Sequence, residues 1–491
     1  MIKFGASQLQ CVLPVRRQKV DVTFKALPSF DFDILSAYSE IRGRFDYACI
    51  LESSAGAGRL AELSIIVFDP SYFLTASEGV TNVELLRSDR NNVKLADGED
   101  PLEVVQSLVK SFPTTNEKFR FSGGAVGFIS FDTIRYWEKT ALSRRKPLKP
   151  FDESYPDLRF GLYEQGVLIH HTNRKAYYFS SDRVSSNYFS EVNELLKKSN
   201  YKYSPNSKEK FAYTTPKANV SQEAFESSVV RAKEYISDGE IFQVVLSKRL
   251  DFGIEGDPLA FYSSLRKLNP SPYMYYLDLG ESKIIGSSPE MLARVEGGYV
   301  HSFPIAGTRP RSQNKQENAK LAKELLADPK ERAEHLMLVD LGRNDVGRVA
   351  EYGTVSVPEF MQVFEYSHVQ HIVSHVTGKL RAGLSSFDAM RSIFPAGTLS
   401  GAPKIRAIRV VDELEPDARG PYGGAVGYFS FNGGMDSAIT IRTMSLMGNH
   451  ASIQVGAGIV ADSVPETEWN ECDNKANALL RALEISSGGV E

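Results

Sequence analysis

Cysteine is scarce in this chain of 491 residues, which contains only Cys11, Cys49 and Cys472. Three widely separated cysteines are too few for a disulfide framework or a cysteine-rich zinc site. None of them lies in a Gly-x-Cys-x-Gly turn, the setting that presents a thiolate nucleophile. The sequence therefore predicts no disulfide scaffold, no zinc site and no glutaminase nucleophile of its own.

An excess of one charge and long apolar runs are also missing. The 57 basic and 61 acidic side chains leave a formal net charge of −4 and are spread along the chain, so no basic patch suits nucleic acid or an anionic membrane. No apolar run approaches the roughly 18 residues that cross a bilayer, and the N-terminal residues do not resemble a signal peptide. We therefore expect a cytoplasmic protein with no nucleic-acid partner and no membrane partner.

The composition, 42% apolar and 24% charged, is enough for a large core. Residues 196–220 mix Lys, Ser, Asn, Pro and Tyr without periodicity, which predicts a linker at the surface. The linker divides the chain into an N-terminal domain, 1–195, and a C-terminal domain, 221–491. After it, Ser221 is expected to cap a helix whose apolar positions recur at helical spacing, namely Phe225, Val229, Ala232 and Ile236.

Two glycine-rich segments resemble each other across 300 residues. GGAVGFISFD at 123–132 and GGAVGYFSFN at 423–432 share seven of ten positions, and both are typical of strands that another backbone approaches closely. We interpret them as a structural echo between two sheets; a chance match of composition is the alternative. Strands are also expected at Ser437 to Met444 and Ile453 to Val460. Together with the helical patterns they indicate an α+β protein.

A helix is expected to begin at Asp328 and Pro329. On it Glu334, Leu338, Leu341 and Asp345 fall on one face. A Glu at the edge of an amphipathic face is the ordinary interpretation. However, a carboxylate beside apolar surface is costly unless a cation or hydrogen bonds compensate it, so a metal or substrate role is the competing hypothesis.

A second helix follows Pro465 and places Glu471 four residues before Lys475, which makes the two side chains neighbours. Such a pair usually only supports a surface helix. The strand before it runs into Gly456, Ala457 and Gly458, whose backbone amides could bind an anion. A bulge in the strand is the alternative interpretation of these glycines.

Three further segments are candidates for a binding site. Period-two alternation places His371 and His375 on one face of a strand, although a lone His is more often structural. PAGTLSGAPKIRA at 395–407 and SFPIAGTRPR at 302–311 are loops in which a binding role and a plain connection are equally plausible. From residues alone, the outline is an anion-plus-metal site, and spacing does not say whether these segments meet.

Five motifs in one order resemble the chorismate-utilising enzyme family, and within it the anthranilate synthase component I group. They are PIAGTRPR, EHLMLVDLGRND, PAGTLSGAPK, PYGGAVGYFSF and GAGIVADSVPETE. The resemblance covers roughly residues 40–485. It implies a fold of β-sheets packed as a sandwich with surrounding helices. It also implies a lyase that aminates chorismate with ammonia and eliminates pyruvate to give anthranilate, the first committed step of tryptophan biosynthesis.

The resemblance also implies roles for individual residues. Glu334 and Glu471 would hold Mg²⁺, which suits carboxylate oxygens. His371 matches the general acid/base position, and Glu290 and Thr398 are further catalytic candidates. The substrate-binding positions carried over from the family are Gly307, Thr308, Tyr422, Arg442, Gly456, Ala457, Gly458 and Lys475.

Two positions distinguish members of the family. Gln243 stands where relatives that add water to chorismate have Lys, and Ala306 stands where aminodeoxychorismate synthases have a Lys that forms a covalent intermediate. We therefore expect direct attack by ammonia. Without a nucleophilic cysteine here, the ammonia would come from a separate glutamine amidotransferase subunit, component II, in a heterotetramer. An aminodeoxychorismate synthase and a catalytically silent tryptophan-sensing subunit are the alternatives.

Feedback inhibition by L-tryptophan is the last implication. CILESSAG at 49–56 resembles the family's tryptophan-binding element, and NPSPYMYYL at 269–277 resembles its companion segment. The residues implied at this site are Glu52, Ser53, Pro272, Tyr273 and Met274. The residues after Ser53 depart from the family pattern, and a plain buried strand with a turn is the alternative.

Overall fold

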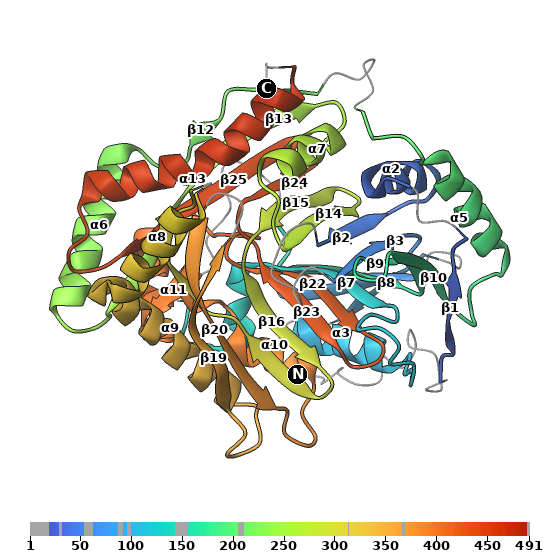
Figure 1. The fold of residues 1–491 in the computed structure, drawn as a ribbon, viewed down its shortest axis with the longest axis horizontal. Helices are drawn as coiled ribbons and strands as arrows, with labels where there is room; N and C mark the ends of the chain where they lie inside the picture. Colours follow the sequence, from blue (N-terminus) through green and yellow to red (C-terminus); the bar gives the residue numbers. More distant parts are fainter. Residues whose placement is uncertain are drawn as a thin grey trace.

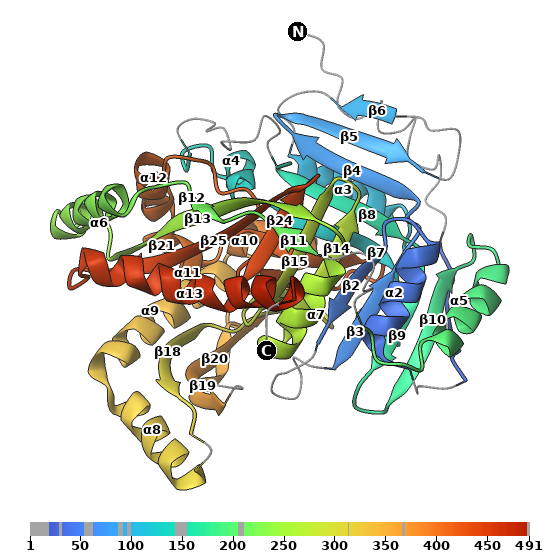
Figure 2. The same ribbon diagram turned by 90° about the horizontal axis from the view of Figure 1, so that it is seen from above.

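The computed structural model describes residues 19–28, 32–53, 62–86, 92–95, 100–142, 155–204, 211–312, 314–365 and 369–488. Within these ranges the chain forms two large sheets, one of 13 and one of 12 strands, and the strand pairs recorded there are antiparallel. Helices surround the sheets, as Figures 1 and 2 show. The predicted α+β class, with sheets packed as a sandwich and helices around them, is confirmed.

The 13-stranded sheet, here the first sheet, draws its strands from both sides of the predicted linker. In spatial order they are β1 (Val22–Ala26), β10 (Lys175–Ser181), β9 (Gln165–His170), β3 (Leu63–Val67), β2 (Cys49–Glu52), β14 (Tyr273–Leu279), β15 (Ser282–Ser288), β24 (Thr443–Met447), β25 (His450–Ile459), β13 (Gln243–Glu255) and β11 (Ala212–Tyr213), with β12 (Lys217–Ala218) and β21 (Gly401–Ala402) also paired to β13.

The 12-stranded sheet, here the second sheet, is also built from both parts of the chain. Its strands in spatial order are β18 (Ile305–Pro310), β20 (Val369–Lys379), β17 (Tyr299–Ser302), β16 (Met291–Glu296), β23 (Met435–Ile439), β22 (Ala425–Ser430), β7 (Gly124–Ile129), β8 (Leu158–Tyr163), β4 (Tyr72–Ser77), β5 (Val80–Leu85) and β6 (Asn92–Leu95), with β19 (Ser356–Glu365) paired to β20.

The helices lie around these sheets and cover their faces. They are α2 (Ile34–Arg44), α3 (Pro101–Lys110), the 3₁₀ turn η2 (Phe131–Thr133), α4 (Ile134–Trp137), α5 (Asn187–Lys198), α6 (Gln222–Ser237), α7 (Leu259–Leu268), α8 (Lys315–Ala327), α9 (Pro329–Gly347), α10 (Ser386–Ile393), α11 (Gly397–Ser400), α12 (Lys404–Leu414) and α13 (Pro465–Ser486). In the described ranges, no helix is both long and apolar enough to span a bilayer.

Alternation along the strands produces two cores. On β14, Tyr275 and Leu277 join the apolar cluster that the two sheets share, whereas Met274 and Tyr276 join the cluster beneath the helices. The helix-side cluster includes α6 and α13, which lie against β13 and β25, and α7, which lies against β14, β15 and α13 (Figure 1). Because successive strand residues point to opposite faces, the first sheet contributes side chains to both cores.

Helix α6 forms as its sequence predicts. The Ser221 hydroxyl accepts the backbone N–H of Ala224, and Phe225, Val229 and Ala232 are buried. The predicted linker is more ordered than expected, because α5 ends inside it at Lys198 and the short strands β11 and β12 pair with β13. The division into domains at 196–220 stays a prediction.

The two echo segments meet in one sheet. β7 and β22 are antiparallel neighbours in the second sheet, with Gly127 directly opposite Gly427. The expectation of an echo between two sheets was therefore wrong. A Cβ on Gly127 would lie 2.0 Å from the Arg159 carbonyl oxygen, and one on Gly427 would lie 2.1 Å from the Asp436 carbonyl oxygen. The shared glycines thus serve close backbone packing.

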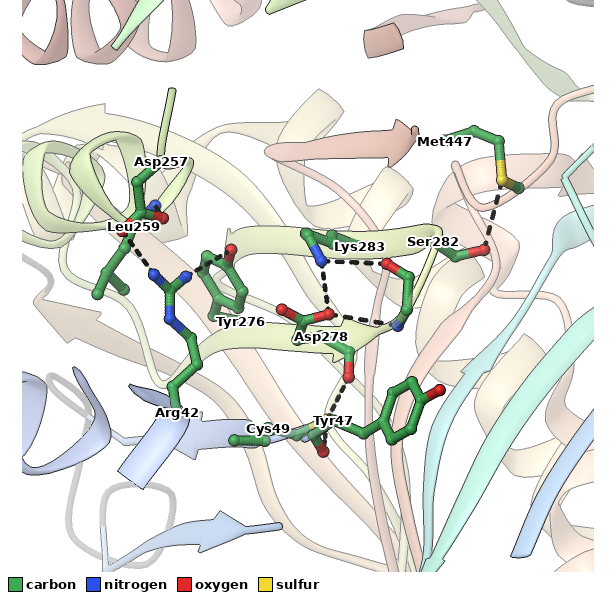
Figure 3. Close-up of polar contacts among 12 residues, drawn as sticks. Arg42, Tyr47, Cys49, Asp257, Leu259, Tyr276, Asp278, Ser282, Lys283 and Met447 are labelled. Carbon is green, nitrogen blue, oxygen red and sulfur yellow. Dashed lines mark hydrogen bonds and ion pairs between the residues drawn. The ribbon is translucent and has the colours of Figure 1, made fainter. Parts of the chain in front are cut away.

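Polar contacts fasten the N-terminal part to the C-terminal part where β2 pairs with β14 (Figure 3). Arg42 on α2 donates to the Tyr276 hydroxyl at 3.1 Å and to the Asp257 carboxylate at 2.5 Å. The Cys49 thiol is buried beside the Asp278 carbonyl, and burial raises its pKa to about 12. Such burial disfavours the thiolate form that a nucleophilic cysteine needs.

Candidate active site

Two connections between the sheets lie side by side and carry Glu290 and Arg442. β15 of the first sheet leads through Glu290 into β16 of the second sheet, and β23 of the second leads through Arg442 into β24 of the first. The Ile439 amide donates to the Glu290 carbonyl at 3.0 Å, and the Ser287 amide donates to the Arg442 carbonyl at 3.1 Å.

The single strand expected at Ser437 to Met444 is therefore wrong. The chain leaves the second sheet after Ile439 and enters the first at Thr443, and Arg442 has a φ of 49° between them. Positive φ is uncommon outside glycine and is held only where surrounding contacts require it. Arg442 thus sits on a change of sheet instead of within a strand.

A cavity of about 570 Å³ opens beside this crossing and is here called the main cavity. Helices α9 and α13, the turn α11 and strand β25 contribute to its wall. The sequence-derived candidates that line it are Glu290, Glu334, Thr398, Tyr422, Arg442, Gly456, Gly458, Glu471 and Lys475. Segments up to 185 residues apart in sequence, from Glu290 to Lys475, therefore meet at one place.

Glu334 faces the main cavity from α9. Asp328 caps this helix by accepting from the amides of Lys330 and Glu331, so the helix begins as predicted. The fully buried stripe is one residue further along, at His335, Val339 and Val346, which leaves Glu334 partly exposed at its edge. In the described structure Glu334 makes no hydrogen bond or ion pair. Burial raises its pKa; Lys330 opposes the rise, and Glu331, Asp328 and, least, Glu471 add to it.

Glu471 and Lys475 face the same cavity from α13. Their side chains form an ion pair at 2.7 Å, and the Lys475 ammonium also donates to the Gly456 carbonyl at 2.8 Å. The pair is half exposed, so it contributes little to stability. It does fix a cation and a carboxylate next to the backbone of β25.

Glu290 and Thr398 are joined by a 2.9 Å hydrogen bond from the threonine hydroxyl to the carboxylate. Burial raises the pKa of Glu290 to about 7, against the opposing effects of Thr398 and Arg442. A carboxyl group that titrates near neutrality can hold or release a proton at the working pH. The Arg442 guanidinium donates to Asn269 at 3.3 Å, and burial lowers its pKa.

The glycines of β25 make room for polar side chains. A Cβ on Gly456 would lie 2.7 Å from the Tyr422 hydroxyl, and one on Gly458 would lie 2.7 Å from the Gln243 amide nitrogen. These clashes explain the two glycines better than a bulge, since the register of β13 with β25 is unbroken. The side chain of Ala457 points the other way, into the helix-side core.

His371, Gly307 and Thr308 form a separate group that does not line the main cavity. The segment expected as a loop is strand β18, in which Thr308 pairs with His371 and Gly307 forms a bulge before it. His371 Nδ1 lies 3.0 Å from the Gly307 carbonyl and 3.1 Å from the Thr308 hydroxyl. Burial lowers the pKa of His371, the Gly307 carbonyl opposes this, and Arg442 adds to the decrease. The group therefore lies within electrostatic range of the cavity.

Sequence reasoning missed several residues on the cavity wall, among them Lys330, Gln454 and Glu468. Glu468 lies three residues before Glu471 and therefore on the same face of α13, a spacing that could have identified it. Burial raises the pKa of Glu468, while a hydrogen bond from Ser463 opposes the rise. Gln454 offers no such signal, because only the pairing of β13 with β25 brings it to the wall.

A second cavity, of about 40 Å³, lies between the sheets and is here called the small cavity. Glu52, Ser53, Tyr273 and Met274 line it as the resemblance implies, whereas Pro272 does not. The Glu52 carboxylate accepts from Arg266 at 2.6 Å and from the Tyr262 hydroxyl at 3.1 Å. Residues 54–56 of the CILESSAG segment lie outside the described residues.

Asp436 also lines the small cavity, although sequence reasoning missed it. Its carboxylate accepts from Arg294 at 2.7 Å and from the Tyr273 hydroxyl at 3.0 Å. The acidic groups on this wall are thus held by arginines and tyrosines, in contrast to Glu334 in the main cavity.

The donor set of the main cavity fits a magnesium ion better than a metal with a complete protein cage. In the part of the chain that the structure describes, no three His, Cys, Asp or Glu side chains gather as a metal cluster. Two carboxylates, Glu334 and Glu471, face this cavity, and Glu471 is close enough to contribute to the raised pKa of Glu334. Mg²⁺ is commonly bound through one or two carboxylates, with water and substrate completing its shell.

Comparisons with known proteins agree on one family. A family model described as chorismate binding enzyme matches residues 47–481. The chain is 44% identical over 456 residues to anthranilate synthase component 1 of Methanothermobacter marburgensis, with 93% of each chain covered. It is 46% identical over 455 residues to the protein of that name from Acetivibrio thermocellus, with 89% of this chain and 90% of that one covered.

Solved structures agree as well. The crystal structure of anthranilate synthase component I from Streptococcus pneumoniae TIGR4 matches with a TM-score of 0.74 at 34% sequence identity. The match covers 93% of this chain and 99% of that chain. The fold and the sequence therefore both show that this chain belongs to the chorismate binding enzyme family.

Proposed function

Because this chain belongs to the chorismate binding enzyme family, we propose that it is the component of an anthranilate synthase that converts chorismate. The observation that carries the proposal is the main cavity. It combines two carboxylates suited to a metal, Glu334 and Glu471, with two cations suited to a dicarboxylate, Arg442 and Lys475. Chorismate carries two carboxylates and is therefore matched in charge to this set.

The carboxylates of chorismate would bind to different parts of the wall. Arg442 can grip one carboxylate through two parallel hydrogen bonds, which its planar guanidinium favours. Lys475 already contacts the Gly456 carbonyl and lies beside the amides of β25, which supports a second anion position. The Tyr422 hydroxyl, held against Gly456, would orient the ring between them.

Magnesium would bind to Glu334 and Glu471. Glu334 is partly buried without a hydrogen bond or ion pair in the described structure, and a carboxylate in that state is stabilised by a bound cation. When bound, Mg²⁺ would polarise the substrate and stabilise developing negative charge. Glu471 would exchange its ion pair with Lys475 for the metal, which frees the ammonium for the substrate.

Proton transfer falls to Glu290 and His371. The ring hydroxyl leaves as ammonia adds to the ring, and pyruvate is then eliminated to leave an aromatic product. Glu290, with its pKa near 7 and its hydrogen bond from Thr398, can exchange a proton inside the cavity. Burial lowers the pKa of His371, which favours the neutral imidazole that a general base requires.

The nucleophile is proposed to be ammonia, not water or a lysine. Gln243, which lines the cavity, carries an amide that cannot act as a general base toward water. Ala306 offers no amine for a covalent intermediate. An aminodeoxychorismate synthase is therefore the less favoured function, and a silent tryptophan-sensing subunit would not be expected to keep these carboxylates.

The ammonia would be supplied by a glutamine amidotransferase subunit in a heterotetramer, within the cytoplasm. Cys49 and Cys472, the two cysteines in the described ranges, are buried, and burial raises the pKa of each to about 12. Neither can attack glutamine at neutral pH. This supports a division of labour between two chains.

Feedback inhibition by L-tryptophan is proposed at the small cavity. Glu52 and Tyr273 line this cavity and could bind an amino group and an indole, whereas the side chain of Met274 belongs to the helix-side core. The cavity of about 40 Å³ must open to admit such a ligand. A short path joins it to the main cavity, because Arg266 holds Glu52 and Asn269, three residues later, accepts from Arg442.

The test is conversion of chorismate by the purified chain with Mg²⁺ and ammonium chloride. We expect fluorescent anthranilate and pyruvate in equal amounts. Formation of isochorismate or of an aminodeoxychorismate would refute the proposed function, as would an equal rate in the presence of excess EDTA.

A further inference from the structure

Arg419 is a fully buried cation that none of the proposed catalytic steps uses. Its side chain is 1% exposed, and that of its partner Glu415 is 7% exposed. Buried arginines are rare unless they are paired and hydrogen bonded, because removing the charge from water is costly. The positions of its hydrogen-bond partners therefore indicate which part of the molecule this cation stabilises.

The hydrogen bonds of Arg419 reach two walls of the main cavity. Its guanidinium donates to the Leu399 carbonyl at 2.6 Å and to the Val245 carbonyl at 2.7 Å. Leu399 and Val245 both line the main cavity, on α11 and β13. Because Thr398 precedes Leu399 in the same turn, the bond to Leu399 also helps to place the hydroxyl that binds Glu290.

Glu415 extends the same network to a third wall. It accepts two hydrogen bonds from Arg419, at 2.7 and 2.9 Å, and two from the amide and hydroxyl of Ser247, both at 2.8 Å. The Ser247 hydroxyl in turn accepts from the Gln454 amide at 2.8 Å. Gln454 lines the main cavity on β25, so one ion pair joins α11, β13 and β25.

Two aromatic rings and a neighbouring backbone contact also surround Arg419. The guanidinium carbon of Arg419 lies 4.5 Å from the centre of the Phe131 ring and 5.7 Å from that of Tyr422. The next amide, that of Gly420, donates to the buried Asp132 carboxylate at 2.8 Å. Arg419 is thus held in place from the N-terminal part while it contacts the ring of a substrate-binding candidate.

We propose that Arg419 is a positioning residue that sets the relative placement of Thr398, Tyr422 and the β13–β25 wall of the main cavity. The inference rests on the proposed function, because it concerns how well that cavity is shaped for chorismate. Reacting groups must be held within a fraction of an ångström, so a small shift of several wall elements lowers turnover strongly. Lysine would keep the charge but could not reach Glu415, Leu399 and Val245 together.

The test compares Arg419→Lys with a matched control, Arg249→Lys. Arg249 is 2% exposed and is paired with Asp251 and Asp417, yet it does not line the main cavity. We expect both variants to lose thermal stability. Only Arg419→Lys should lose kcat/KM for chorismate, by about tenfold or more per folded molecule, while Arg249→Lys stays within about twofold of the parent.

A double variant shows whether the effect passes through the α11 turn. In the Arg419→Lys background, Thr398→Val should cost less than it does in the parent, because the turn is already displaced. An unchanged kcat/KM for Arg419→Lys would overturn the inference. If Arg419→Lys fails to fold, Glu415→Gln provides the same comparison, and parental kinetics for that variant would likewise overturn it.

The parent enzyme separates this inference from the proposed function. If the parent forms anthranilate and the Arg419 and Glu415 variants retain its kcat/KM, only the positioning role fails. If the parent forms none, the proposed function fails, and chorismate affinity measured by calorimetry reports on Arg419 instead. An equal affinity of parent and Arg419→Lys would then contradict the inference.

Discussion

The carboxylates that line the main cavity and those that line the small cavity differ in their hydrogen-bond and ion-pair partners. In the small cavity, Glu52 and Asp436 are each held by an arginine and a tyrosine. In the main cavity, Glu334 makes no such contact in the described structure, and Glu471 has one half-exposed lysine. A site whose carboxylates are hydrogen bonded or ion paired within the protein is stable when closed. A carboxylate without such partners is instead stabilised by a bound cation.

This difference fits a preformed main cavity and a small cavity that is closed in this structure, as the proposed regulatory role requires. A volume of about 570 Å³ is in the range of small-molecule sites, whereas about 40 Å³ holds little more than water. Binding at the small cavity must therefore displace side chains that the sheets now hold. Three substitutions test this comparison.

The largest effect is expected from Glu471→Gln. Removing one of two proposed metal carboxylates should lower kcat by at least about a hundredfold, because a metal contributes several kcal/mol to charge stabilisation. The measurement is anthranilate formation as a function of Mg²⁺ concentration. Glu484→Gln is the matched control, since Glu484 lies on the same helix in a similar ion pair with Arg481. Equal losses in both variants would remove Glu471 from the metal site.

A pH-dependent effect is expected from Glu290→Gln. The Glu290 carboxyl has an ordinary pKa of 4.5, which burial raises to about 7. Between these values the folded protein holds a proton that the unfolded chain has lost, so the contribution to stability falls as pH rises from about 4.5 to 7.

Glu290→Gln should remove this part of the pH dependence of unfolding. It should also abolish the ionisation near pH 7 in the kcat/KM profile. Chemical denaturation and initial rates between pH 5 and 8 measure the two effects, at roughly one-unit steps. A variant that keeps the ionisation near pH 7 would contradict its assignment to Glu290.

The smallest effect on turnover is expected from Ser53→Ala. It should weaken inhibition by L-tryptophan severalfold while uninhibited turnover changes little, because Ser53 lines the small cavity and not the main one. Inhibition curves for parent and variant provide the measurement. Ser199→Ala, a buried serine on the outer helix layer, controls for loss of a hydroxyl. Equal inhibition of Ser53→Ala and parent would contradict the regulatory role.

Local patterns predicted local structure well. The cap at Ser221, the helix start at Asp328 and the pairing of Glu471 with Lys475 depend on neighbours in sequence, and the structure has all three. Arg442 could not be placed in this way. Alternation continues across it, and only the separation of the two sheets shows that the chain must turn there.

The spacing of residues in the sequence also could not predict which distant segments meet in the fold. Glu334 and Glu471 meet because α9 and α13 flank one cavity, and Gly127 meets Gly427 because β7 pairs with β22. The resemblance to a family indicated which residues belong together. It did not indicate Arg419, because two of its hydrogen bonds go to the backbone carbonyls of Leu399 and Val245, which any residue type could supply.

The most direct test of the central claim is a crystal structure of the protein grown with Mn²⁺ and chorismate or a stable analogue. Manganese can replace magnesium and is located by its anomalous scattering. We predict one manganese ion between Glu334 and Glu471, with the ligand's carboxylates at Arg442 and Lys475. A ligand bound elsewhere, or a metal that contacts neither glutamate, would contradict the account.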